Sequence, residues 1–146
     1  MWKAWSELEA LGVIGPERPR MVSVQSTATP PLVRAITSGA PDTTYAEAGA
    51  TLCAGLNVPV GVGHFRVLEI LRASGGTAIA VEEADTAAAL RDVWRRTGWW
   101  ICPEGAACLA ALQALVKRGT IRQGDRVVVV NTASLEKYLP SVRHLL

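Results

Sequence analysis

Apolar side chains recur every three or four positions in five stretches of the chain, which is the spacing of an amphipathic helix. In the first stretch, Trp2, Trp5 and Leu8 lie three residues apart. Glycines close four of the stretches, as expected where helices end: Gly12, Gly39, Gly75 and Gly119. The pattern predicts these helices: residues 2–11, 30–38, 64–74, 82–97 and 103–117.

Short runs rich in β-branched residues lie between the helical stretches and predict strands. Residues 21–26 and 77–81 form two such runs, and residues 99–102 form a shorter extended segment. Arg126–Asn131 is a continuous β-branched run with four valines at its centre, the pattern of a strand buried on both faces. We expect three strands, or four if residues 99–102 also pair.

The alternation of strands and amphipathic helices predicts an α/β fold with three αβα layers and a mostly parallel sheet of three to four strands. The chain fits a single domain, residues 1–146. Residues 41–63 are rich in Gly, Pro, Ala and Thr, and predict an irregular but ordered loop. Few strands and a hydrophobic content of 49% suggest that the sheet lacks some of its neighbours.

Composition and charge exclude several classes of protein. The net charge is only +2 and its charges are interspersed, so we expect no nucleic-acid partner. No apolar run approaches the roughly 18–20 residues that span a bilayer, so we expect no membrane association. The N-terminal stretch does not read as a signal peptide. Three cysteines without C-x-x-C spacing and two distant histidines, His64 and His144, predict free thiols, no metal site and a cytoplasmic location.

Two polar segments that follow extended stretches are candidates for a ligand site. Cys102–Ala107 opens a helix, and Glu104 suits its first turn. The helix N-terminus and the small side chains at Gly105 and the following alanines would let a ligand approach closely. Asn131 and Thr132 follow the last predicted strand, the place where open α/β sheets bind ligands, and a threonine hydroxyl suits a ring nitrogen. Both segments also fit structural roles, a well-capped core helix and an ordinary turn.

The lysines do not suggest covalent chemistry. The chain has only Lys3, Lys117 and Lys137, and the first two lie on amphipathic helices where they should face solvent. A desolvated lysine that could form a Schiff base is therefore not expected. The glycine clusters form neither a G-x-G-x-x-G motif nor a P-loop. We expect no catalytic residue within this chain.

Five segments, in the same order along the chain, resemble the threonine synthases. They are LEALGVIGPERPR at 8–20, AGLNVP at 54–59, LRASGGTAIAV at 71–81, CPEGAA at 102–107 and NT at 131–132. No single segment is decisive, but their common order is specific. The resemblance extends over nearly the whole chain.

The resemblance implies part of the large domain of a fold type II pyridoxal-phosphate enzyme, a lyase that makes threonine and phosphate from O-phosphohomoserine and water. The family holds its cofactor by a lysine, an asparagine and a glycine-rich loop, and this chain has no match to them because it resembles only the C-terminal part. Thr132 matches the hydroxyl that meets the pyridine nitrogen, and Glu104 and Gly105 lie in the other matching segment. Ala133 and Leu135 replace family glycines, which would crowd the site.

We therefore expect a C-terminal fragment of a threonine synthase that is inactive and binds no pyridoxal phosphate by itself. Its expected partners are the missing N-terminal part of the enzyme and a second copy, in a homodimer that buries the first helix or the edge strand. Two alternatives stay open. One is a fragment of a threonine dehydratase or cysteine synthase, and the other is a non-catalytic small-ligand or interaction module derived from the fold.

Overall fold

The computed structural model describes residues 1–145, and in that part of the chain helices far outnumber strands. The five predicted helices form, and so do the first two predicted strands, each within a residue or two of the expected bounds. The elements, in chain order, are α1 Trp2–Ala10, β1 Val22–Ser26, α2 Pro31–Ser38, η1 Ala54–Leu56, α3 His64–Ala73, β2 Thr77–Val81, α4 Glu83–Thr97, α5 Pro103–Lys117, η2 Leu135–Tyr138, α6 Leu139–Val142 and η3 Arg143–Leu145.

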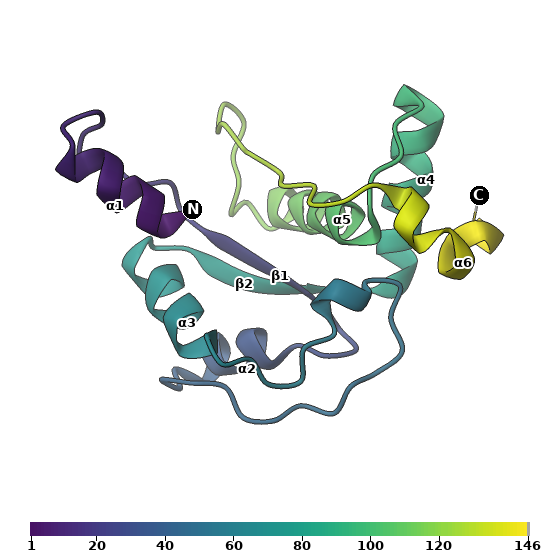
Figure 1. Ribbon diagram of the computed structural model, residues 1–146, viewed down its shortest axis with the longest axis horizontal. Helices are drawn as coiled ribbons and strands as arrows, with labels where there is room; N and C mark the ends of the chain where they lie inside the picture. Colours follow the sequence, from purple (N-terminus) through teal and green to yellow (C-terminus); the bar gives the residue numbers. More distant parts are fainter. Residues whose placement is uncertain (146) are drawn as a thin grey trace.

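The two strands form a parallel pair with helices on both faces. The register runs from Val22 opposite Thr77 to Ser26 opposite Val81. Parallel strands need a long crossover connection, and α2 and α3 lie in it. These two helices cover one face of the sheet, α5 covers the other, and α4 packs beside α5 (Figure 1). The predicted α/β fold with three αβα layers is confirmed.

The predicted number of strands is wrong, because the described residues form a sheet of two strands and not three or four. Arg126–Asn131 is not a strand and runs beside α5, apart from β1 and β2 (Figure 1). Val128, at its centre, is 89% exposed. The segment before α5 makes a single antiparallel bridge, from Ile101 to Ser134. A strand buried on both faces needs neighbouring strands and covering layers, and residues 1–145 supply neither to this run.

The larger hydrophobic core lies between the sheet and α5. Ile79 and Val81 of β2 point into it, together with Leu90 of α4. The face of α5 that meets them consists mainly of alanines: Ala106, Ala107, Ala110, Ala111 and Leu115. Small side chains let this helix approach both the sheet and α4, which shares more contacts with α5 than with any other element. A smaller cluster of Leu32, Ala35 and Leu68 joins α2 to α3.

Strand β1 also holds the start of α2. Gln25 is 4% exposed, and its side-chain Oε1 accepts hydrogen bonds from the backbone N–H groups of Leu32 and Val33 at 2.9 and 3.1 Å. These N–H groups lie in the first turn of the helix, where they have no partner within the helix itself. One strand side chain therefore supplies the capping acceptor that Pro30, at the N-cap position, lacks.

Residues 41–63 contain one short element, η1, and are otherwise irregular. Polar side chains attach this loop to the rest of the protein. Thr29 Oγ1 donates to Asn57 Oδ1 at 2.6 Å and accepts from Gly49 N at 3.2 Å, while Asn57 Nδ2 donates to Gly49 O at 3.0 Å. Thr29 is fully buried, so this closed ring of hydrogen bonds fixes the loop at its contact with the β1–α2 turn.

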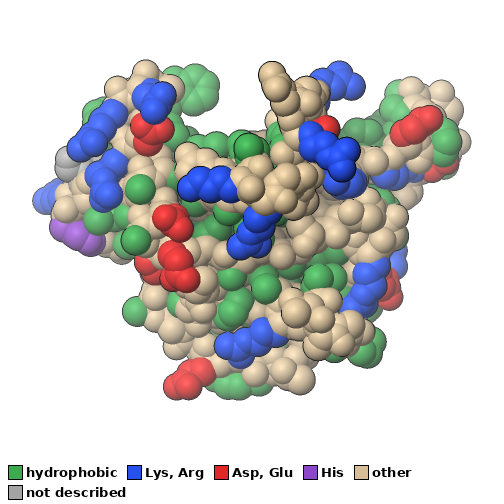
Figure 2. All heavy atoms as spheres, turned by 180° about the vertical axis from the view of Figure 1, so that it is seen from behind, with side chains coloured by type: hydrophobic (Ala, Val, Ile, Leu, Met, Phe, Trp, Pro, Cys, Tyr) green, Lys and Arg blue, Asp and Glu red, His purple; other side chains and the backbone are tan. Residues whose placement is uncertain are grey.

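The surface mixes chemical types. On the face opposite to that of Figure 1, basic and acidic side chains alternate with hydrophobic ones (Figure 2). Among residues 1–145, no helix combines the length and the hydropathy that crossing a bilayer requires.

Candidate functional site

The first predicted site segment forms the N-terminus of α5. Cys102 is the N-cap, and its fully buried Sγ accepts a hydrogen bond from Gly105 N at 3.4 Å. Pro103 occupies the first helical position, where its missing N–H has no consequence. Glu104 adds a carboxylate to the first turn, which the helix dipole favours. The helix start is thus stabilised by local interactions.

Asn131 connects this helix start to the second predicted segment. Its Oδ1 accepts from Cys102 N at 3.1 Å and from Cys102 Sγ at 3.2 Å, and its Nδ2 donates to Ala133 O at 2.8 Å. A Cβ atom on Gly105 would lie 2.4 Å from Asn131 Oδ1, far inside van der Waals contact. Glycine is therefore needed at position 105 so that the asparagine can approach.

Glu104 joins three distant parts of the chain. Its Oε1 accepts hydrogen bonds from Gly55 N at 2.9 Å and from the Tyr138 hydroxyl at 3.1 Å. Its Oε2 is buried and has no hydrogen-bond partner among the described residues. Buried carboxylate oxygens are usually paired, so this atom is an acceptor that an additional donor would satisfy. Gly55 lies in the AGLNVP segment of the resemblance, but neither it nor Tyr138 was expected at Glu104, since only the fold brings them there.

Two protonated groups surround this carboxylate. Burial, together with the hydrogen bond to Glu104, raises the pKa of Tyr138 to about 12. Burial also raises the pKa of the Cys53 thiol to about 12, with contributions from the nearby carboxylates of Glu83 and Glu104. Tyr138 therefore remains a hydrogen-bond donor at neutral pH, and Cys53 remains an unreactive thiol.

Thr132 lies next to Asn131, and its side chain is exposed. The structure therefore brings the three predicted cofactor-binding residues to one region: Glu104 and Gly105 on α5, and Thr132 one residue beyond the asparagine that contacts that helix. Leu135 is 1% exposed and belongs to the larger core, so its side chain packs away from the exposed Thr132. Ala133 and Leu135, which replace family glycines, do not have a positive φ. No residue other than glycine has a positive φ among residues 1–145.

A second carboxylate, Glu83, was missed by the sequence analysis. It lies at the carboxyl ends of both strands, in the first turn of α4. Its Oε1 accepts from Ser26 Oγ at 2.6 Å and from Thr51 Oγ1 at 2.7 Å, and its Oε2 accepts from Leu52 N at 2.7 Å. Burial raises the pKa of Glu83, but these three hydrogen bonds outweigh it, and the pKa is lowered below its ordinary value.

A shallow hollow of about 490 Å³ lies beside Glu83. Its walls come from the loop at residues 50–52, the start of α4 and the C-terminal residues Ser141, His144 and Leu145. The Glu83 carboxylate already accepts three hydrogen bonds from the protein, so it offers little to a ligand. The hollow does not include Glu104, Gly105 or Thr132.

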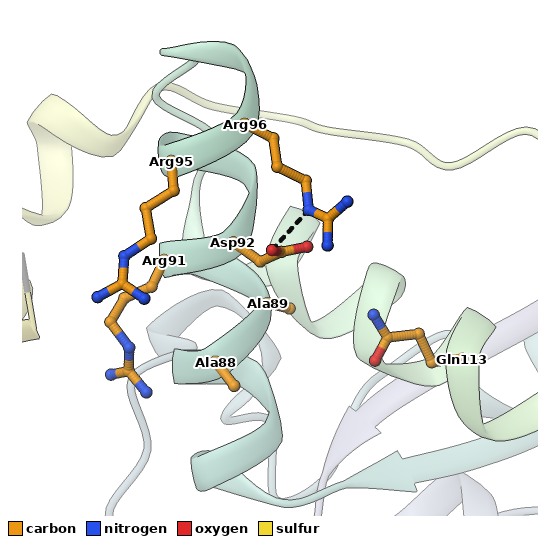
Figure 3. Close-up of a pocket in the computed structure, with 7 residues that line it drawn as sticks. All are labelled: Ala88, Ala89, Arg91, Asp92, Arg95, Arg96 and Gln113. Carbon is orange, nitrogen blue, oxygen red and sulfur yellow. Dashed lines mark hydrogen bonds and ion pairs between the residues drawn. The ribbon is translucent and has the colours of Figure 1, made fainter.

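A second hollow of about 390 Å³ lies along α4 and is lined by arginines. Figure 3 shows Arg91 and Arg95 pointing to one side of the helix, while Arg96 turns to the other side toward Asp92. Arg96 Nε donates to Asp92 Oδ1 at 2.7 Å, so its charge is already paired. The three guanidinium groups do not converge on one point, which argues against a built anion site.

None of the three lysines is buried in the structure. Lys3 pairs with Glu7 on the exposed face of α1, and Lys117 is exposed at the end of α5. Lys137 is also exposed, with its ammonium 5.5 Å from the centre of the Tyr138 ring. A lysine in a water-excluded pocket, the setting that favours Schiff-base chemistry, does not occur among the described residues.

Comparison with curated proteins confirms the resemblance to threonine synthases. The threonine synthase of Methanosarcina acetivorans is 34% identical over 137 residues, which are 94% of this chain and 34% of that protein. That of Methanocaldococcus jannaschii is 28% identical over 132 residues, 90% of this chain and 32% of the relative. The chain thus spans about a third of the length of these relatives.

Solved structures share the fold. Threonine synthase from Escherichia coli superposes with a TM-score of 0.69 at 21% identity, over 92% of this chain and 30% of that one. Serine racemase from maize gives a TM-score of 0.59 at 17% identity, over 86% of this chain and 39% of that one. At such identities the likeness concerns the fold alone. Because residues 2–133 match the family described as pyridoxal-phosphate dependent enzyme, the chain belongs to that family.

Proposed function

We propose that this chain is part of a threonine synthase, the pyridoxal-phosphate-dependent lyase that converts O-phosphohomoserine and water to threonine and phosphate. The observation that supports this most strongly is that relatives named threonine synthase match 90% or more of the chain. Because the chain spans about a third of their length, the proposed enzyme needs a complementary part, which would supply a Schiff-base lysine and a phosphate-binding loop. We place the complete enzyme in the cytoplasm.

The described residues fit one edge of pyridoxal phosphate. Thr132 offers an exposed hydroxyl, and the hydrogen bonds of Asn131 tie its position to the start of α5. When bound, pyridoxal phosphate supplies an electron sink for carbanions. A hydroxyl partner, unlike a carboxylate, would not keep the ring nitrogen protonated, so Thr132 would moderate that sink. The exposed lysines do not fit the attachment of the cofactor.

Glu104 acts in this proposal as a positioning residue. Its carboxylate holds the loop at Gly55 and the hydroxyl of Tyr138 around the N-terminus of α5. Tyr138 keeps its proton because its pKa is about 12, so this arrangement persists at neutral pH. The buried Oε2 that lacks a partner among residues 1–145 would accept a hydrogen bond from the complementary part or from the cofactor.

The test combines this chain with the two thirds of the Methanosarcina acetivorans synthase that it does not match. Phosphate release from O-phosphohomoserine should be absent with either part alone and present with both. Thr132→Val in this chain should lower the rate of the mixture by roughly tenfold or more, since the ring nitrogen loses its partner. Thr120→Val removes another exposed threonine, outside the site, and should leave the rate unchanged.

Other results would redirect the proposal. Phosphate release by this chain alone that Thr132→Val abolishes would overturn the need for a complementary part. Ammonia release from threonine, without phosphate release, would favour the threonine dehydratase alternative, and sulfide-dependent cysteine formation would favour a cysteine synthase. A stable complex that is inactive toward all of these substrates would favour a non-catalytic module.

A further inference from the structure

The chain leaves the start of α5 at Asn131 and returns to it at Tyr138. Asn131 Oδ1 accepts a hydrogen bond from Cys102 N at 3.1 Å. Further along the chain, the Tyr138 hydroxyl donates to Glu104 Oε1, also at 3.1 Å. Residues 132–137 therefore form an arch whose near end, at Asn131, and far end, at Tyr138, are both attached to the start of one helix.

The middle of the arch is held differently from its far end. Ile101 and Ser134 form an isolated antiparallel bridge, and Leu135 N donates to Trp100 O at 3.2 Å. These contacts join backbone groups, and the side chain of Leu135 also belongs to the larger core. The attachment of the far end to α5, in contrast, depends on one side-chain hydroxyl, that of Tyr138.

Glu104 connects the far end of the arch to its near end. Its Oε1 accepts from the Tyr138 hydroxyl and from Gly55 N, while its buried Oε2 has no partner among residues 1–145. Without the hydroxyl, a partly buried carboxylate would keep a single hydrogen bond, so the side chain would turn toward water. Glu104 lies in the helix turn that Cys102 caps, and Cys102 N contacts Asn131. A shift of Glu104 would therefore reach the near end of the arch.

We infer that Tyr138 is a positioning residue that holds Thr132, the first residue of the arch, in place through Glu104. This inference rests on the proposed function, since Thr132 is the residue that would meet the cofactor. Tyr138 lies beyond residues 2–133, which match the family. Burial and the hydrogen bond to Glu104 raise the pKa of Tyr138 to about 12, so the hydroxyl remains a donor throughout the neutral pH range.

Hydrogen exchange of the isolated chain tests the connection without the cofactor. Tyr138→Phe keeps the ring and removes only the hydroxyl. The amides of Gly55 and Cys102 should then exchange roughly five- to tenfold faster, because a hydrogen bond to a charged group is lost beside them. Those of β1 and β2 should change less. Tyr45→Phe is the matched control: Tyr45 is 69% exposed, its hydroxyl makes no hydrogen bond within residues 1–145, and all rates should stay unchanged.

The two-part enzyme of the proposed function tests the consequence for the site. In that mixture, Tyr138→Phe should lower kcat for phosphate release by roughly fivefold, while KM and the dissociation constant of the two parts stay within about twofold. A general loss of structure would instead weaken the assembly. Tyr138→Phe combined with Glu104→Ala should be no slower than Glu104→Ala alone, because both changes break the same connection.

These measurements separate the inference from the proposed function. If the wild-type mixture releases no phosphate, the proposed function fails, and the exchange rates at Gly55 and Cys102 still decide whether Tyr138 holds the arch. Unchanged exchange at Cys102 in Tyr138→Phe would overturn the inference. So would an active mixture in which Tyr138→Phe keeps the wild-type kcat. Additive losses in the double variant would also contradict it, since Tyr138 would then act independently of Glu104.

Discussion

At the scale of single residues, two glutamates hold the same loop from two sides. Glu83, in the first turn of α4, accepts a hydrogen bond from Leu52 N, and Glu104, in the first turn of α5, accepts one from Gly55 N. A carboxylate at a helix N-terminus is favoured by the helix dipole, and here each one also accepts a hydrogen bond from a backbone N–H of the loop. An otherwise irregular segment thereby gains fixed backbone partners next to the candidate site.

Glu83→Gln should destabilise the chain by about 1–2 kcal/mol at neutral pH, a modest value because the side chain is only half-buried. The three hydrogen bonds lower its pKa in the folded state below the ordinary value of 4.5. Its contribution is therefore complete above the unfolded-state pKa and is lost as the pH falls through the folded-state pKa. Urea unfolding of both proteins should show a difference at pH 7 that shrinks below about pH 4.

Glu82→Gln is the matched control for that comparison. Glu82 is exposed and accepts one hydrogen bond, from Thr27 Oγ1 at 2.9 Å, so its replacement should cost little. A difference between wild type and Glu83→Gln that stays constant down to acid pH would mean that the carboxylate charge is not what stabilises the loop.

At the scale of elements, local periodicity was enough to predict the five helices, because each has an apolar face and a glycine or proline near its end. The sequence also singled out Glu104, Gly105 and Thr132, which lie in one region of the structure. It could not predict Gly55 and Tyr138 at Glu104, since their sequence separations from it are set only by the fold. For Arg126–Asn131 the pattern indicated burial, but burial depends on neighbouring strands that the described chain does not contain.

The attachment of α2 to β1 should depend on one side chain, Gln25. Gln25→Leu would leave the N–H groups of Leu32 and Val33 without a partner in a buried place, and should cost about 1–3 kcal/mol in the free energy of unfolding. Gln123→Leu makes the same chemical change at an exposed position and should cost much less. Equal costs, measured by urea unfolding, would show that the capping contact does not stabilise the helix.

At the scale of the whole molecule, the described residues form an αβα unit with a sheet of two strands. Its candidate site offers residues for only one edge of a cofactor. It matches about a third of the length of the threonine synthases compared with it. The described residues supply a hydroxyl at Thr132 and a well-fixed helix start, but each lysine is exposed. An exposed lysine reacts with an aldehyde as free lysine does, since nothing desolvates or orients it.

Pyridoxal phosphate added to this chain alone should therefore label its lysines without selectivity. After borohydride reduction, peptide mass spectrometry should find the label spread over Lys3, Lys117 and Lys137, and dialysis before reduction should remove most of it. Thr132→Val should not change this distribution, because in the proposed enzyme Thr132 would meet a cofactor that the complementary part holds. A one-to-one label on a single lysine that survives dialysis and disappears when that lysine becomes arginine would show that this chain binds the cofactor specifically by itself.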